Sequence, residues 1–219
     1  MKNLRVRITG ERLTDWQTYH NVVAEYLRPG MKVLEVGCGR GDVAPFPWLE
    51  FPGVELTGLD TDPAASVNPF LARFVGPSEK RRWPLESETF DLVVCRYVLE
   101  HVDDPATFLG NIQRVLKKGG SFVSLTPNAW HPQILAARLL PLWLKRRILQ
   151  ATKGIRGDQV FPTFYRLNSL PRIAHLARRH GFEVSALLTK EFVPSNYLDF
   201  SFVGFLLSSA YFMTMVKTG

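Results

Sequence analysis

Strand-length runs of mostly apolar residues recur along the chain and are separated by polar or glycine-rich segments. Such runs occupy residues 33–36, 89–95 and 121–126, and they are typical of parallel strands that are covered on both faces. Residues 105–116 predict a helix, because a proline stands in the first turn and Lys117-Lys118-Gly119-Gly120 supplies a cationic end and a glycine stop. The pattern predicts a sheet of the α/β class.

Three glycines follow the first run at every second position, as Gly37, Gly39 and Gly41, and the acid Glu35 precedes them. Glycine lets the backbone turn sharply and lie against a ligand, since no side chain stands in the way. A second acid, Asp60, comes 19 residues after Gly41, at the end of the next predicted strand. An acid in that place accepts hydrogen bonds from ribose hydroxyls. The spacing therefore predicts a ligand that contains a nucleoside.

The order of the glycines selects among nucleoside ligands. Dinucleotide folds use G-x-G-x-x-G, whereas this chain has E-x-G-x-G-x-G and no G-x-x-x-x-G-K-S/T phosphate loop. Glu35 would repel a pyrophosphate but suits a ligand with a cationic amino group. S-adenosyl-L-methionine has a sulfonium, an ammonium and a carboxylate beside its nucleoside, so it is the predicted cofactor.

Residues 31–128 resemble the class I S-adenosylmethionine-dependent methyltransferases, in particular the type 11 or quinone-methyltransferase-like group. The resemblance rests on Val33-Leu34-Glu35-Val36-Gly37-Cys38-Gly39-Arg40-Gly41, Phe90-Asp91-Leu92-Val93-Val94, Leu99-Glu100-His101-Val102-Asp103-Asp104-Pro105 and Pro127-Asn128. It implies a Rossmann-like, doubly wound, seven-stranded sheet with an antiparallel last strand, inserted beside the sixth. It also implies methyl transfer, but the acceptor does not follow from the fold.

The resemblance further implies which residues bind the cofactor. They are Glu35, Gly37, Cys38, Gly39, Gly41, Asp60, Thr61, Ser78, Glu79, Cys95 and Tyr97. Members of the group often hold the adenine amino group with an acid at the position of Pro77, and a proline side chain cannot accept that bond. Adenine recognition is therefore expected from the backbone near Pro77 and Ser78, or from Glu79. Cys38 and Cys95 are expected in loops on the ligand side, and they indicate neither a disulfide nor a zinc site.

Length and composition predict one domain, residues 1–219, in a reduced, cytoplasmic setting without a signal peptide. Its parts are an N-terminal segment and helix at 1–30, a cofactor-binding core at 31–128, a helical substrate cap at 129–167, and a C-terminal helix with the last strands at 168–219. The cap is predicted because a plain connection after the fifth strand would be short. The alternative is a helix packed on the sheet far from the site.

The uncharged stretch at residues 200–216 has two interpretations. A buried last strand at about 211–217, preceded by a helix or edge segment at 197–207, fits the family fold. A membrane anchor is the alternative, although the stretch is short for a bilayer span. The core strand is the favoured prediction.

The net charge of +7 is unevenly distributed, because no acid occurs between Asp104 and Asp158. A solvated basic face is one interpretation, and attraction to an anion is the other. Aliphatic residues are interleaved with the basic ones. This mixture favours an amphipathic or anionic acceptor, or peripheral contact with a membrane or a lipid-linked substrate, over nucleic acid. The sequence indicates no oligomeric state.

Methyl transfer to a hydroxyl requires a base for its proton. His101, after the fourth strand, and His131, after the fifth, are the candidates; structural roles, such as capping the next helix, are the alternatives. Tyr165 and Arg166 are candidates for orienting an acidic acceptor, although Arg166 could instead pair with a surface acid. No cluster of metal ligands accompanies these motifs, so no metal is expected.

The predicted function is methylation of a small molecule, such as O-methylation of an amphipathic metabolite, a quinone precursor or a lipid-linked sugar. A nucleic-acid methyltransferase is the first alternative, and it is disfavoured because no N-P-P-Y motif or RNA-binding module is present. The second is a non-catalytic cofactor-binding protein, and the intact glycine loop with Asp60 argues against it.

Overall fold

The computed structural model describes residues 5–8, 14–43, 45–76, 81–141, 143–144, 147, 162–190 and 210–218. The strands are β1 (Arg5–Ile8), β2 (Lys32–Val36), β3 (Glu55–Leu59), β4 (Arg73–Val75), β5 (Phe90–Arg96), β6 (Leu116–Pro127), β7 (Phe182–Lys190) and β8 (Ala210–Lys217). The helices are α1 (Asp15–Tyr26), α2 (Pro105–Val115), α3 (Pro132–Leu139) and α5 (Leu170–Arg179), with 3-10 turns η1 (Trp48–Glu50), η2 (Pro63–Val67) and η3 (Leu99–His101).

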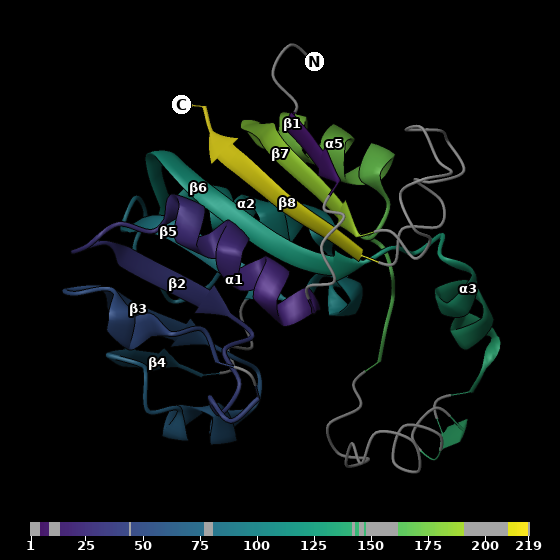
Figure 1. Ribbon diagram of the computed structural model, residues 1–219, viewed down its shortest axis with the longest axis horizontal. Coiled ribbons are helices and arrows are strands. Elements are labelled where there is room, and N and C mark those ends of the chain that lie inside the picture. The colour runs from purple at the N-terminus through teal and green to yellow at the C-terminus, as the bar shows by residue number, and fades with distance from the viewer. Residues whose placement is uncertain are drawn as a thin grey trace.

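The strands form one sheet in the order β1-β7-β8-β6-β5-β2-β3-β4 (Figure 1). Only β8 runs antiparallel to its neighbours, and it is inserted between β6 and β7. The seven predicted strands and the antiparallel last strand are therefore confirmed. The eighth strand, β1, was not predicted. It is a four-residue edge strand, Arg-Val-Arg-Ile, paired in parallel with β7, and so short a segment with two charges gives no continuous apolar signal.

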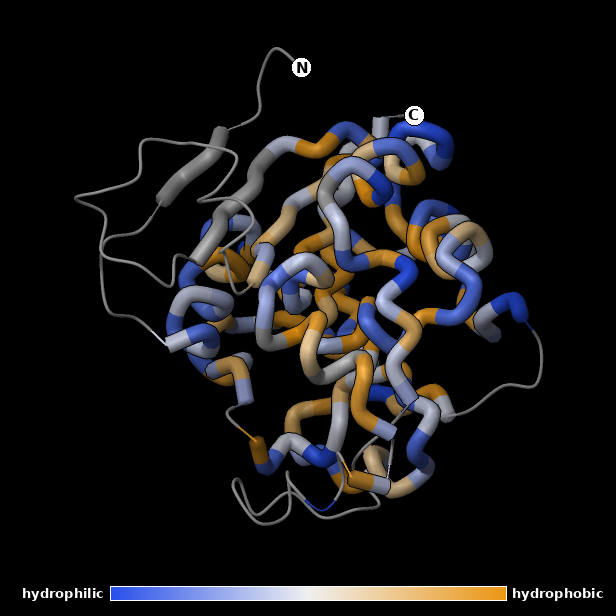
Figure 2. Tube along the Cα trace, turned by 90° about the vertical axis from the view of Figure 1, so that its right-hand side faces the viewer, coloured by the Kyte–Doolittle hydropathy of each residue, from blue (hydrophilic) through white to orange (hydrophobic). Residues whose placement is uncertain are grey.

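Helices cover both faces of the sheet, which is the doubly wound arrangement that the sequence predicts. On one face, α1 packs Tyr19 and Val23 into a buried cluster with Val94. On the other face, α2 and α5 pack against Val93, because successive strand residues point to opposite sides. Figure 1 shows α1 in front of the sheet and α2 and α5 behind it, and Figure 2 shows the hydrophobic segments gathered in the middle of the molecule.

The connections between the strands of the cofactor half contain little helix among the described residues. Among the described residues between β2 and β3 the one helical segment is η1, and between β3 and β4 it is η2. Aromatic rings pack together in the first of these connections: the ring centroids of Phe46 and Trp48 are 4.4 Å apart, and Phe51 stacks on Phe46. The glycine loop after β2 is held by hydrogen bonds from the side chains of Asp60 and Asn68.

The predicted cap begins with α3, which follows β6 at the carboxyl edge of the sheet (Figure 1). Residues 148–161 lie outside the described residues, so the cap assignment stays a prediction. The predicted core strand near the C-terminus is confirmed as β8, and its Tyr211 and Met213 are fully buried. The helix or edge segment expected at 197–207 lies outside the described residues. None of the helices in the described part of the chain is long and apolar enough to cross a bilayer.

Candidate cofactor and acceptor site

The glycine loop follows β2 at the carboxyl edge of the sheet, and all three of its glycines have positive φ: 71° at Gly37, 54° at Gly39 and 76° at Gly41. A Cβ at Gly37 would collide with the Val98 side chain, and one at Gly41 would lie 2.7 Å from the Asn68 Oδ1. A Cβ at Gly39 would meet nothing within 4 Å. Gly37 and Gly41 are therefore required by packing, and Gly39 presents bare backbone to open space, as a closely bound ligand requires.

Asp60 follows β3 and closes this loop from the other side. Its Oδ2 accepts a hydrogen bond from the Gly39 N–H at 2.9 Å, and its Oδ1 accepts one from the Asp62 N–H at 2.9 Å. Each carboxylate oxygen can accept a second bond, so the side chain keeps capacity for the two ribose hydroxyls. Thr61, the next predicted contact, is exposed beside it. The structure brings Asp60 and the glycine loop together, as predicted, although Gly39 and Asp60 are 21 residues apart in the sequence.

Asn68, which the sequence analysis did not identify, clamps the same loop. Its buried amide donates to the Cys38 carbonyl at 3.1 Å and the Gly39 carbonyl at 3.2 Å, while its Oδ1 accepts from the Phe70 N–H at 3.1 Å. These bonds fix the Cys38 and Gly39 carbonyls, and so they also fix the direction of the neighbouring N–H groups. An asparagine in a turn usually bonds its own backbone, so no local signal indicates this long-range role.

Glu35 lies in β2 with a buried carboxyl. Burial raises its pKa from 4.5 to about 7, against the opposing effects of the Arg96 charge and of a hydrogen bond from the Trp48 side chain. A cation placed beside this carboxyl would favour its ionised form. The contact of Glu35 with the ammonium group of the cofactor stays a prediction, and such a contact would lower the raised pKa of this carboxyl.

Arg96 and Tyr97, at the end of β5, tie the start of α1 to this edge. The Arg96 guanidinium lies 3.8 Å from the Trp16 ring centroid and donates to the Val43 carbonyl at 3.1 Å. The Tyr97 hydroxyl donates to the Asp15 carboxylate at 2.7 Å, and burial together with this bond raises the pKa of Tyr97. The hydroxyl of Tyr97 is therefore turned toward α1, and its contact with cofactor stays a prediction.

One of the two cysteines, Cys95, differs from its predicted surroundings. Cys95 lies inside β5 rather than in a loop, and it is fully buried in the cluster beneath α2. Cys38 is in the glycine loop, but its side chain is 7% exposed and packs where Gly58 leaves room for its Sγ. Burial raises the pKa of both thiols. The loop placement of Cys95 is therefore wrong, because β5 continues one residue beyond it, whereas Cys38 lies in the predicted loop with a buried side chain. Contact of either residue with the cofactor stays a prediction.

The predicted catalytic residues fall into two groups. His101 ends η3, and Tyr165 and Arg166 lie in the segment that returns to α5; the structure brings these three together, because the N–H groups of Phe164 and Tyr165 both donate to the Glu100 carbonyl. Arg166 forms an ion pair with Asp103 at 2.7 Å, the surface partner that was the alternative to binding an acceptor.

His131 stands apart from that group. Its side chain is 4% exposed, and its carbonyl accepts from the Leu135 N–H in the first turn of α3. This position matches the helix-start alternative for His131. Its candidacy as a base is not tested by these contacts.

A buried polar chain lies beneath His101. The Asn168 amide donates to the Thr126 hydroxyl, which donates to the Glu100 carboxyl at 3.4 Å. Burial raises the pKa of Glu100 from 4.5 to about 7, and bonds from its own backbone and from Thr126 oppose the rise. The chain of bonds runs from η3 to β6 and on to the segment before α5, so it joins these three parts of the molecule.

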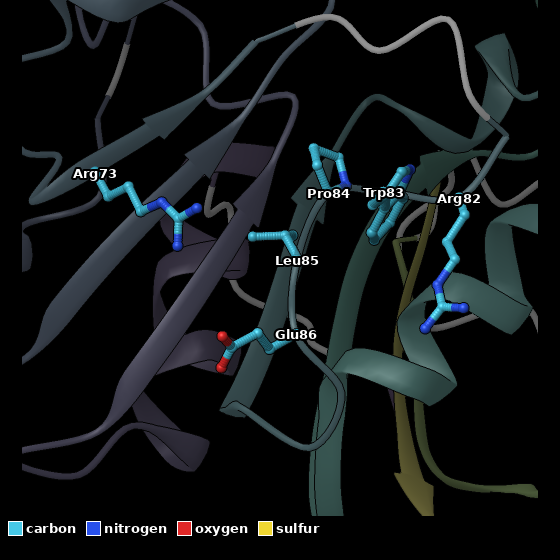
Figure 3. A pocket seen from close by; sticks show the side chains of 6 residues that line it. All are labelled: Arg73, Arg82, Trp83, Pro84, Leu85 and Glu86. Atoms are coloured by element: carbon cyan, nitrogen blue, oxygen red, sulfur yellow. The ribbon is translucent and has the colours of Figure 1, made fainter.

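A separate shallow pocket lies beside β4, away from these residues. It is lined by Arg73, Arg82, Trp83, Pro84, Leu85 and Glu86 (Figure 3). It includes none of the predicted cofactor residues, and it is not assigned to the reaction. Ser78 and Glu79, predicted to recognise adenine, lie outside the described residues, as does Pro77. No three His, Cys, Asp or Glu side chains gather as metal ligands within the part of the chain that the structure describes.

The arrangement defines a class I methyltransferase fold with a site that fits S-adenosylmethionine. Bare backbone at Gly39, the carboxylate of Asp60 and the buried acid Glu35 match the ribose and the amino group of that molecule. A family profile described as a methyltransferase domain matches residues 9–187, and the chain belongs to this family. It is an S-adenosylmethionine-dependent methyltransferase.

The relatives give the context of that assignment. The ubiquinone biosynthesis O-methyltransferase of a Ruegeria species is 29% identical over 189 residues, which are 80% of this chain and 72% of that protein. The mitochondrial ubiquinone biosynthesis O-methyltransferase of Schizosaccharomyces pombe is 31% identical over 64% of this chain, and the match spans 52% of that protein. A solved SAM-dependent methyltransferase from Methanosarcina mazei has a TM-score of 0.62 at 18% identity, covering 90% of this chain and 97% of that one, and it supports the fold.

Proposed function

We propose that this chain is an O-methyltransferase for a small hydroxylated acceptor, of which a quinone precursor is the leading candidate. The observation that carries the proposal is that Gly39, Asp60 and His101 follow the carboxyl ends of three neighbouring parallel strands, β2, β3 and β5, and that Gly39 is hydrogen-bonded to Asp60. The Ruegeria and fission-yeast relatives are ubiquinone biosynthesis O-methyltransferases, which supports the choice of a hydroxyl as acceptor.

The residues of the cofactor half bind and orient. Asp60 accepts from the ribose hydroxyls, Gly39 lets the ligand approach the backbone, and Glu35 faces the amino group. Asn68 keeps the loop in the shape that makes these contacts possible. The bound cofactor supplies a methyl group already activated by its sulfonium, so the protein contributes chiefly orientation and exclusion of water.

The residues near the acceptor are proposed to receive its proton and to contact it. A hydroxyl becomes a competent nucleophile as its proton leaves, and His101 is the side chain proposed to receive it. Tyr165 lies beside it on the returning segment and is proposed to contact the acceptor. Residues 129–167 are proposed to cover the acceptor, and their mixture of basic and aliphatic residues suits an amphipathic or anionic molecule, with peripheral contact to a lipid-linked substrate as an extension.

The test is methyl transfer from labelled S-adenosylmethionine to a panel of acceptors. The panel holds protocatechuate, caffeate, a prenylated catechol, a nucleoside and bulk tRNA, and mass spectrometry of the product distinguishes O- from C-methylation. We expect O-methylated catechols, with the prenylated catechol the better substrate. Asp60→Asn serves as the control that keeps the fold and weakens the cofactor contact. Label in tRNA with none in any catechol would contradict the proposal.

A further inference from the structure

A short segment, residues 162–168, is bound to η3, the turn that follows β5, and to the carboxyl end of β6, and we refer to it as the strap. Its Phe164 and Tyr165 N–H groups donate to the Glu100 carbonyl at 2.7 and 3.1 Å. Tyr165 has a positive φ of 52°, which a tyrosine adopts only when its surroundings hold it there. In Figure 1 the strap is the green connection that leads from the grey trace up to α5.

The far end of the strap is anchored to β6. The Asn168 amide donates to the Thr126 hydroxyl and, at 3.3 Å, to the Pro127 carbonyl, and the Ala129 N–H donates to the Asn168 carbonyl at 2.9 Å. Leu167 and Asn168 are fully buried. The strap is therefore fixed at η3 and at the carboxyl end of β6.

One contact of the strap acts on the proposed base directly. The Nδ1 of His101 lies 2.6 Å from the Pro162 carbonyl oxygen. A carbonyl oxygen can only accept, so Nδ1 must carry the hydrogen in this bond. In a neutral imidazole the other nitrogen, Nε2, then has the lone pair. The backbone of the strap thus selects one tautomer of His101.

We propose that the strap is a positioning element that holds His101 in the Nδ1–H tautomer and directs Nε2 toward the acceptor hydroxyl. The inference rests on the proposed O-methylation. As the acceptor oxygen bonds to the methyl carbon, the carbon–sulfur bond breaks and its electron pair stays on sulfur. The acceptor proton passes to Nε2, and the resulting imidazolium is stabilised by its bond to the Pro162 carbonyl until it releases the proton to water.

The inference gives Arg166 a role that differs from binding an acceptor. Arg166 bonds both the Asp103 carboxylate and the Asp103 carbonyl, at 2.7 and 2.8 Å. These two contacts, which we call the clasp, join the strap to the loop that follows His101. Arg166 is therefore a positioning residue. Among the described residues of η3, the loop that follows it and the strap, the ionisable groups besides His101 are Glu100, Asp103, Tyr165 and Arg166.

The first experiment reads the tautomer without requiring any activity. The protein is labelled with ring-¹⁵N histidine, and the Nδ1 and Nε2 shifts of His101 are measured at a pH where the ring is neutral, with His101→Gln identifying its signals. We expect hydrogen on Nδ1 and a lone pair on Nε2. Hydrogen on Nε2 would overturn the inference. This result is independent of the acceptor, so failure of the proposed function leaves it readable.

The second experiment loosens the clasp and restores it. Asp103→Asn and Arg166→Gln should each increase the minor tautomer of His101 and lower kcat with protocatechuate by about two- to fivefold, because an exposed ion pair contributes little. The KM for S-adenosylmethionine should not change. The charge-exchanged pair Asp103→Arg with Arg166→Asp should recover the parent values. Arg172→Gln on α5 is the control, an exposed arginine away from the strap. Single variants that leave the tautomer ratio and kcat at the parent values would overturn the role of the clasp.

Discussion

Replacing Asn68 tests whether the shape of the glycine loop depends on a single amide. Asn68→Ala removes the donor to the Cys38 and Gly39 carbonyls and the acceptor for the Phe70 N–H. A hydrogen bond of this kind contributes about 0.5–1.5 kcal/mol net. Loss of the two loop bonds therefore costs about 1–3 kcal/mol. Expressed as binding, that range corresponds to an affinity for S-adenosylhomocysteine lower by about 5- to 150-fold.

A second variant separates the loop bonds from the turn bond. Asn68→Asp keeps the size of the side chain and an oxygen for the Phe70 N–H, but it places an oxygen against the two carbonyls. We expect it to weaken binding at least as much as the alanine variant does. Titration calorimetry gives the affinity, and thermal unfolding reports stability separately. If both variants bind S-adenosylhomocysteine within twofold of the parent, the loop does not need the clamp, and the argument from these contacts fails.

Three further predictions concern the same site. Gly39→Val should abolish cofactor binding, because its side chain would occupy the open space over the loop; Gly30→Val also introduces a side chain at positive φ into open space, but remote from the site, and should bind normally in the same calorimetric assay. Burial raises the Glu35 pKa from 4.5 to about 7, so the folded state binds more protons than the unfolded state in that window and stability falls as pH rises through it. The fall in the free energy of unfolding should be smaller in Glu35→Gln, by up to about 3 kcal/mol. Urea unfolding at a series of pH values measures it, and a pH profile identical to that of the parent would contradict the raised pKa. Methyl transfer should survive EDTA; loss of activity that magnesium restores would show a metal-assisted reaction.

The sequence predicted the sheet well because its inner strands are buried on both faces. β2, β5 and β6 have continuous apolar runs for that reason, and their order follows from the family resemblance. Boundaries were less predictable. β6 begins at Leu116 rather than at Ser121, because Leu116 pairs with Phe90 before an irregularity in the ladder shifts the register. Such a bulge depends on the partner strand, which local sequence does not contain.

The sequence predicted those site residues whose type and spacing indicate a particular role. The spacing of Asp60 and the glycines predicts that they meet, and the hydrogen bond between Gly39 and Asp60 confirms it, although Gly37 and Gly41 are also required by packing. Asn68 was missed because its partners lie about thirty residues earlier, and Cys95 was misplaced because the end of a strand depends on pairing. The strap was missed for a related reason. Its bonds are made by backbone groups of residues 162–168, and a backbone carbonyl such as that of Pro162 leaves no signature in the identity of its residue.

The position of β8 has a consequence for the order in which the molecule can be completed. During synthesis β6 and β7 emerge first, and their facing edges stay open until residues 210–217 have been made, since β8 pairs with both. The pair Ser124 and Met213 illustrates how late the closure comes in the chain. Unpaired apolar strand edges invite pairing with other chains, and long-range pairing of this kind is slow. A nascent or truncated chain that stops before β8 is therefore expected to be prone to aggregation, because β7 and β1 join the rest of the sheet through this last strand.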